Sequence, residues 1–174
     1  NSSGHVGQLL GVHAALGVCA RFEEVFDAWH GATQGYWTSL EDEPLVIETF
    51  SATPDIFAIS YEEYSRPIDH LRRVAAAGCI VGDTSEGQVR PGLSEGRSAI
   101  SYSLNETDKK VLLKGQREIA RIFFAAGALE VHTAYAGQTP FKTLEALDQA
   151  QAAPLPVDRI AVYCVQNERY ADGF

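Results

Sequence analysis

The sequence predicts an α+β fold, an antiparallel sheet of about six strands with helices packed on one face. Short segments of β-branched and aromatic residues outnumber the segments with helical spacing of apolar residues. Most of these segments are joined by links short enough for hairpins. A mixed order of strands and helices with short links fits an antiparallel sheet that buries one face against helices.

The first strands are expected at residues 16–25, 32–39 and 45–50. A charged link closed by Pro44 joins the second and third strands, which predicts a hairpin. Because side chains alternate along a strand, one face of the second strand should carry Gln34, Tyr36 and Thr38.

The middle of the chain predicts a helix over about 66–77. Ser65 is its candidate N-cap and Gly78 fits the position after its last turn. A short strand should resume over 79–82. The stretch 83–96 is rich in Gly, Ser and Glu and is expected to be a turn region.

The clearest helix of the sequence is expected over about 106–126. Asn105 or Thr107 is its candidate cap and Gly127 its stop. Its buried stripe should comprise Leu112, Ile119, Ile122, Phe123 and Ala126. The remaining elements are expected to be strands at 97–104, 129–135 and 160–165 and a short helix near 143–151.

The length and the amino-acid composition indicate one soluble domain spanning residues 1–174. The net charge of −9 argues against nucleic acid and anionic membranes as partners. There is no apolar run of transmembrane length and no signal-peptide pattern. Three scattered cysteines, Cys19, Cys79 and Cys164, indicate buried thiols in a reducing compartment, so we expect a cytoplasmic location.

Glu48 is the candidate catalytic residue, because strand alternation puts it on the same face as Val46 and Phe50. An ionised carboxylate is costly to bury between apolar neighbours, and such a setting suits a general acid or base. The alternative from the pattern alone is a solvent-facing glutamate on an edge strand. Histidines with metal-ligand spacing are missing, and so are the GxGxxG, GxxxxGK[ST] and GxSxG motifs.

Several stretches together resemble the glucose–methanol–choline (GMC) flavoprotein oxidoreductases, in particular the long-chain alcohol oxidase and cholesterol oxidase branch. The stretch GHVGQLLGVH at 4–13 is similar to that branch's "hVGrnL.lHP" segment, although Ala14 stands where the branch has proline. The other similar stretches lie at 22–25, 29–34, 47–54, 102–108 and 124–128.

The resemblance is to the family's substrate-binding domain, an antiparallel sheet backed by helices. The parts that bind FAD in the family have no counterpart here, and Val165 stands where the family has its oxidative histidine. This favours a free-standing relative without redox chemistry over a piece of a flavoenzyme. In cholesterol oxidases a glutamate in the strand matching Glu48 moves a proton between two carbons, a step that needs no flavin.

The resemblance therefore leads us to expect a cofactor-independent isomerase, lyase or cyclase acting on a bulky apolar substrate such as a polyketide, terpenoid or steroid. Glu48 and Tyr36 are its expected catalytic residues. The expected substrate-binding residues are Gln34, Trp37, Phe50, Tyr61 and Tyr102. No metal is expected, and FAD only if a partner chain supplies its binding domain.

Two alternatives remain open from the sequence. One is a non-catalytic binding module for lipophilic ligands that uses the same pocket. The other is a subunit or fragment of an FAD-dependent alcohol oxidoreductase. In every case a sheet face left by a missing flavin domain would be a site for homo-oligomer formation.

Overall fold

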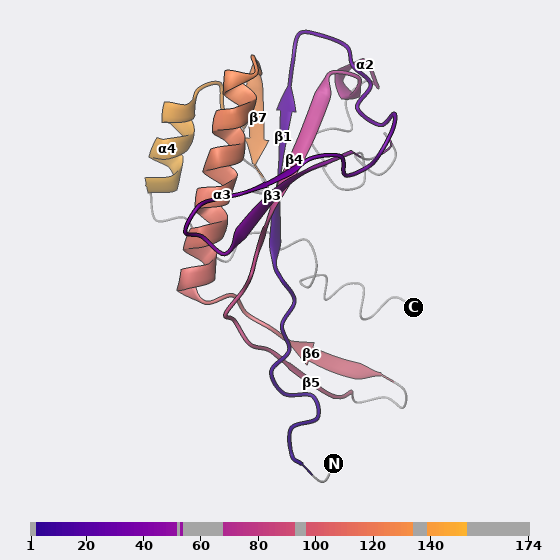
Figure 1. Ribbon diagram of the computed structural model, residues 1–174, viewed down its shortest axis with the longest axis vertical. Helices are drawn as coiled ribbons and strands as arrows, with labels where there is room; N and C mark the ends of the chain where they lie inside the picture. Colours follow the sequence, from indigo (N-terminus) through magenta and orange to yellow (C-terminus); the bar gives the residue numbers. More distant parts are fainter. Residues whose placement is uncertain (1–2, 52, 54–67, 93–96, 134–138, 153–174) are drawn as a thin grey trace.

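The computed structural model describes residues 3–51, 53, 68–92, 97–133 and 139–152 (Figure 1). The elements in chain order are β1 (Ala15–Arg21), β2 (Trp37–Ser39), β3 (Leu45–Phe50), α2 (Ile68–Leu71), β4 (Val74–Val81), β5 (Gln88–Pro91), β6 (Ser98–Ser101), α3 (Glu106–Ala125), β7 (Glu130–Thr133) and α4 (Leu144–Ala152). The strand expected at 160–165 lies outside the described residues.

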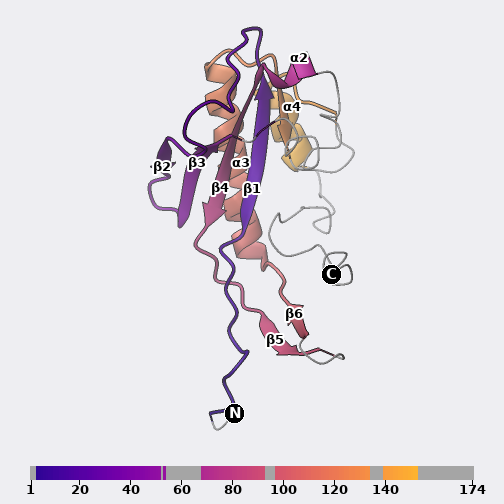
Figure 2. The ribbon, with the colours of Figure 1, turned by 90° about the vertical axis from the view of Figure 1, so that its right-hand side faces the viewer.

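The main sheet is antiparallel, with the strand order β2-β3-β4-β1-β7. The predicted α+β class and the predicted β2–β3 hairpin are confirmed, the latter by the pairing of Trp37 with Glu48. The sheet has five strands, and β5 and β6 form a separate two-stranded ribbon that extends from one end of the body (Figures 1 and 2). The expectation that residues 83–96 hold only turns was wrong, because β5 pairs with β6 there.

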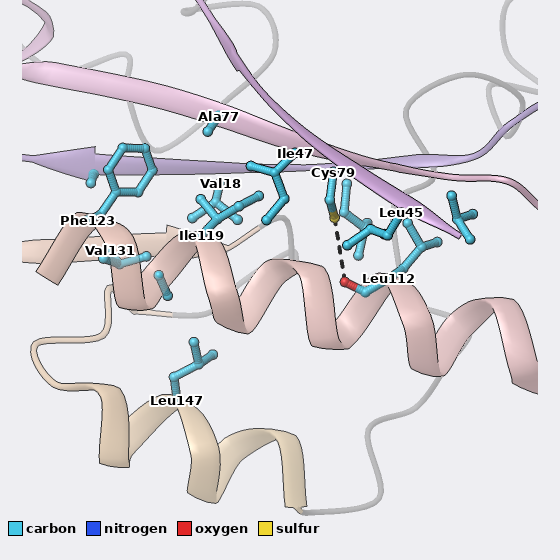
Figure 3. Packing of buried hydrophobic residues seen from close by; sticks show 14 of the residues in the cluster. Val18, Leu45, Ile47, Ala77, Cys79, Leu112, Ile119, Phe123, Val131 and Leu147 are labelled. Atoms are coloured by element: carbon cyan, nitrogen blue, oxygen red, sulfur yellow. Dashed lines mark hydrogen bonds between the residues drawn. The ribbon is translucent and has the colours of Figure 1, made fainter. Parts of the chain in front are cut away.

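The core lies between the sheet and α3, and α4 lies on the far side of α3 (Figure 3). As predicted, α3 starts after Asn105, whose side chain accepts a 2.8 Å hydrogen bond from the Asp108 amide. It ends before Gly127, which has a φ of 92°. Ile122, expected in its buried stripe, is 48% exposed instead. Within the described residues no helix is both long and apolar enough to cross a membrane.

The expectation of a helix over 66–77 was wrong. The helix α2 covers only Ile68–Leu71, and Val74–Val81 forms the strand β4, which pairs with both β1 and β3. The run from Ala75 to Gly78 has helix-like composition, but pairing on both sides at the centre of the sheet overrides that propensity. Small side chains are what allow α3 to approach β4 closely.

The closest approach of α3 to the sheet occurs at Gly115. A Cβ atom at this position would lie 2.7 Å from Leu45 Cδ2 and 2.8 Å from Cys79 Cβ. The Cys79 Sγ atom donates a 3.6 Å hydrogen bond to the carbonyl of Leu112 (Figure 3). Burial raises the pKa of the Cys79 thiol to about 12, so this thiol stays protonated and inert.

The carboxylate of Asp108 ties the start of α3 to the segment that follows β4. It accepts hydrogen bonds from the backbone amides of Thr84 and Ser85 at 2.9 and 2.8 Å, and from both hydroxyl groups. Burial raises the pKa of this carboxyl, but the hydrogen bonds from Ser85 and Thr84 outweigh that effect and hold the pKa below its ordinary value.

Substituting Gly115→Ala should destabilise the fold by about 1–3 kcal/mol, because the new methyl group collides with Cys79 Cβ, which the sheet backbone holds in place. Gly78→Ala is the matched control. A Cβ there would lie at ordinary contact distances of 3.4 Å or more, so stability should change by less than about 1 kcal/mol. Denaturant unfolding of both variants measures this, and equal losses would contradict the packing described.

Substituting Asp108→Asn should cost about 1–3 kcal/mol of stability at neutral pH, because several buried donors lose their charged acceptor. A carboxyl whose pKa is lowered in the folded state stabilises the fold above its unfolded pKa, and this contribution is lost as the pH falls through the folded pKa. The gap between wild type and variant should therefore narrow in acid. Urea unfolding at neutral and acidic pH tests this, and a gap independent of pH would refute it.

Candidate functional site

One face of the main sheet packs against α3, and the other face does not. Alternation along β3 directs Leu45 and Ile47 toward α3, where both are buried, and directs Val46, Glu48 and Phe50 to the opposite face. We call this opposite face the open face, because neither α3 nor α4 covers it (Figure 2). The predicted placement of Glu48 with Val46 and Phe50 follows from this register.

Glu48 lies in a row of residues that crosses four strands. Its paired neighbours are Trp37 on β2 and Gly78 on β4, and Gly78 in turn pairs with Gly17 on β1. Directly paired residues of antiparallel strands point to the same face. Neither glycine has a side chain, and the Phe50 ring occupies the space over Gly78 on this face.

Glu48 is half-buried, and its Oε1 atom accepts a 2.7 Å hydrogen bond from Gln34 Nε2. Gln34 belongs to the segment 28–36, which runs along the edge of β3 beyond the part paired with β2. Two backbone hydrogen bonds hold that segment, from the Thr49 amide to the Tyr36 carbonyl at 2.9 Å and from the Ser51 amide to the Thr33 carbonyl at 2.8 Å. The structure thus brings together Glu48 and Gln34, two of the residues singled out from the sequence.

Two predicted aromatic residues flank Glu48. The Trp37 side chain is 74% exposed on the edge strand beside it. Phe50 is half-buried, and its ring lies 3.6 Å from the position that a Cβ of Gly78 would occupy. Phe50 also packs against a small buried cluster on the open face, which consists of Cys19, Leu71, Val74 and Ala76.

The other predicted tyrosines are placed elsewhere. Tyr36 lies opposite Thr49, the residue after Glu48, and is 81% exposed. Tyr102 donates a hydrogen bond to Asp83 beyond the end of β4, and its pKa is raised by burial and by this carboxylate. Tyr61 lies outside the described residues.

One polar cluster of the open face was missed by sequence reasoning. Arg21 on β1 pairs with Glu130 on β7, and its Nε donates a 2.8 Å hydrogen bond to Glu130 Oε1. His132 Nε2 lies 3.4 Å from the same oxygen. The hydrogen bond from Arg21 lowers the pKa of Glu130 despite its partial burial. These residues are far apart in the sequence, and no motif links them, so only the β1–β7 pairing reveals them.

Comparisons with known proteins identify related sequences. An uncharacterized GMC-type oxidoreductase of Mycobacterium tuberculosis, present in two strains, is 28% identical to this chain over 148 residues, which are 82% of this chain and 23% of the relative. The chain is similar to a GMC-type oxidoreductase over most of its length. It spans about a quarter of the length of these relatives.

A long-chain-alcohol oxidase of Arabidopsis thaliana is 36% identical to this chain over 93 residues, which are 51% of this chain and 12% of the oxidase. No family profile matches the chain, and no solved structure matches it significantly. The relatives support the GMC resemblance read from the sequence.

The relatives overturn two expectations. An isomerase, lyase or cyclase was expected, but the relatives are named as oxidoreductases and an alcohol oxidase, which points to redox catalysis. The expectation of an enzyme without a cofactor was wrong for the same reason, because GMC oxidoreductases normally bind FAD. The error arose from taking the missing flavin motifs as a loss of redox chemistry.

The described residues do not fit the pyrophosphate of FAD. Such a group binds at a helix N-terminus reached by a glycine-rich turn. The first turn of α3 instead holds the carboxylates of Glu106 and Asp108, and that of α4 holds Glu145. Nor does any group of three or more His, Cys, Asp or Glu in the described part of the chain form a candidate metal site.

Proposed function

We propose that this chain is the substrate-binding part of an FAD-dependent alcohol oxidoreductase of the long-chain alcohol oxidase branch. The observation that carries the proposal is the similarity to a GMC-type oxidoreductase over 82% of the chain. The similarity to a long-chain-alcohol oxidase supports the branch and the substrate class. The flavin is held by residues other than those described, since the described helix N-termini carry carboxylates.

Glu48 is the proposed polar contact for the substrate. The hydroxyl group of an alcohol donates a hydrogen bond to the Glu48 carboxylate, and a carboxylate in this position accepts the hydroxyl proton when the alcohol is oxidised. Gln34 orients the carboxylate through its 2.7 Å hydrogen bond. Trp37 and Phe50 supply apolar surface beside it for the carbon chain.

The test uses the protein that contains this chain, tagged at its own gene and isolated from its source cells. Flavin absorbance should copurify with it, and a long-chain primary alcohol added without oxygen should bleach that absorbance. Substituting Glu48→Gln should slow the bleaching roughly a hundredfold, because the proton acceptor is lost.

Glu41→Gln is the matched control, since Glu41 is an exposed carboxylate in the link before β3 and should leave the rate unchanged. Protein without flavin, or flavin that no alcohol reduces, would refute the proposed function. Equal rates for the Glu48 variant and wild type would refute the role of Glu48 alone.

A further inference from the structure

A pocket of about 260 Å³ opens at the end of β3, beside the segment 28–36. Much of its lining consists of two phenylalanines and four alanines. These residues are Phe50, Phe123, Ala28, Ala32, Ala75 and Ala76. An apolar cavity of about 150 Å³ holds benzene, so this pocket has room for a molecule of about six to eight carbons.

The pocket is separate from the Glu48 carboxylate, because Glu48 is not among the residues that line it. Strand alternation directs Ser51 to the face of the sheet that packs against α3, whereas Glu48 points to the open face. Ala75 and Phe123 belong to the same α3 side, and Figure 3 shows Phe123 extending from α3 toward the sheet. A ligand in the pocket therefore reaches Ser51 from the side of α3.

The lining favours an uncharged ligand. Among the described residues, no charged side chain lines the pocket, and burying an ionised group without a partner is costly. Thr33, Thr49 and Tyr36 line it as exposed polar residues. The Thr49 Oγ1 atom already accepts a 3.2 Å hydrogen bond from the Tyr36 amide. Thr33 and Tyr36 are exposed to water, so a ligand gains little by replacing water at their hydroxyl groups.

The Ser51 hydroxyl differs from these polar groups. Its Oγ atom is buried and has no hydrogen-bond partner, which costs free energy that a ligand oxygen would recover. Ser51 lines the pocket although its Oγ is buried, so the hydroxyl meets a ligand by turning about the Cα–Cβ bond to another staggered position. The pocket thus combines apolar walls with one hydroxyl group that a ligand can satisfy.

We propose that this pocket is a second ligand site, which takes an uncharged molecule of about six to eight carbons whose single oxygen hydrogen-bonds to Ser51. The carbon skeleton of the ligand lies against Phe50 and Phe123. This site goes beyond the proposed function, because it requires neither the Glu48 carboxylate nor the oxidation of an alcohol.

Titration of the full chain with cyclohexanone, followed through backbone amide chemical shifts, tests the inference. The ketone accepts a hydrogen bond from Ser51 but has no hydroxyl group to donate to Glu48. Methylenecyclohexane, in which a CH₂ group replaces the oxygen, is the matched probe. Both should shift amides in residues 32–36, 49–51 and 75–76. Ser51→Ala should weaken cyclohexanone about fivefold through the loss of one hydrogen bond and leave the affinity for methylenecyclohexane unchanged.

Ala75→Leu should weaken both probes about tenfold or more, because the larger side chain fills the pocket. Ala99→Leu on the exposed strand β6 is its matched control and should change neither affinity. Should Ala75→Leu fail to fold, Ser51→Ala decides alone, since it removes only an unpartnered hydroxyl and should not lower the free energy of unfolding.

Three results would overturn the inference. One is the same change, or no change, in the affinity for both probes in Ser51→Ala. Another is full affinity in a folded Ala75→Leu variant. The third is weaker cyclohexanone binding in Glu48→Gln, which would place the ligand at Glu48 instead of in the pocket.

Discussion

The close contact between α3 and the centre of the sheet is the constraint on which the rest of the structure depends. Gly115 lets the helix reach Cys79 on β4 and Leu45 on β3, so one helix covers the inner strands. With one face of the sheet used for the core, strand alternation directs every second residue of β3 to the other face. The position of Glu48 is a consequence of this division.

The candidate site combines strands of the sheet with a loop segment that lies along the edge of β3. The sheet provides the rigid part, a row in which Glu48 pairs with Gly78, and Gly78 with Gly17. The segment 28–36 provides the added part, since it folds along the edge of β3, holds Glu48 through Gln34 and walls the adjoining pocket. Rigid elements position polar groups more accurately than loops do, which suits Glu48 for contact with the reacting end of a substrate.

The features that follow from local pattern were predictable from the sequence. The alternation of residues around Glu48 predicts which face of the sheet it lies on, and the charged link before it predicts the β2–β3 hairpin. The capping residue Asn105 and the stop residue Gly127 predict where α3 begins and ends. The end of β4 was predicted as a strand over 79–82, but its first half was not, because a run of small residues favours a helix locally and becomes a strand only through pairing on both sides.

Contacts between segments far apart in the sequence could not be predicted from local patterns either. The Arg21–Glu130 pair depends on strands that lie far apart in the sequence. The pocket at Ser51 depends on where the segment 28–36 meets β3. The relatives support the resemblance to GMC oxidoreductases and contradict the chemistry drawn from it. Missing flavin motifs in one segment carry no conclusion about the whole protein.

We propose that the ligand site lies on the open face of β3 and along its edge beyond β2. Mapping of backbone amide chemical shifts during titration with octanol tests this most directly. The amides of β3, of residues 28–36 and around Gly78 should shift, whereas the amides of α4 and of the ribbon β5–β6 should not. Shifts confined to α4 or to the ribbon, with β3 unaffected, would contradict it.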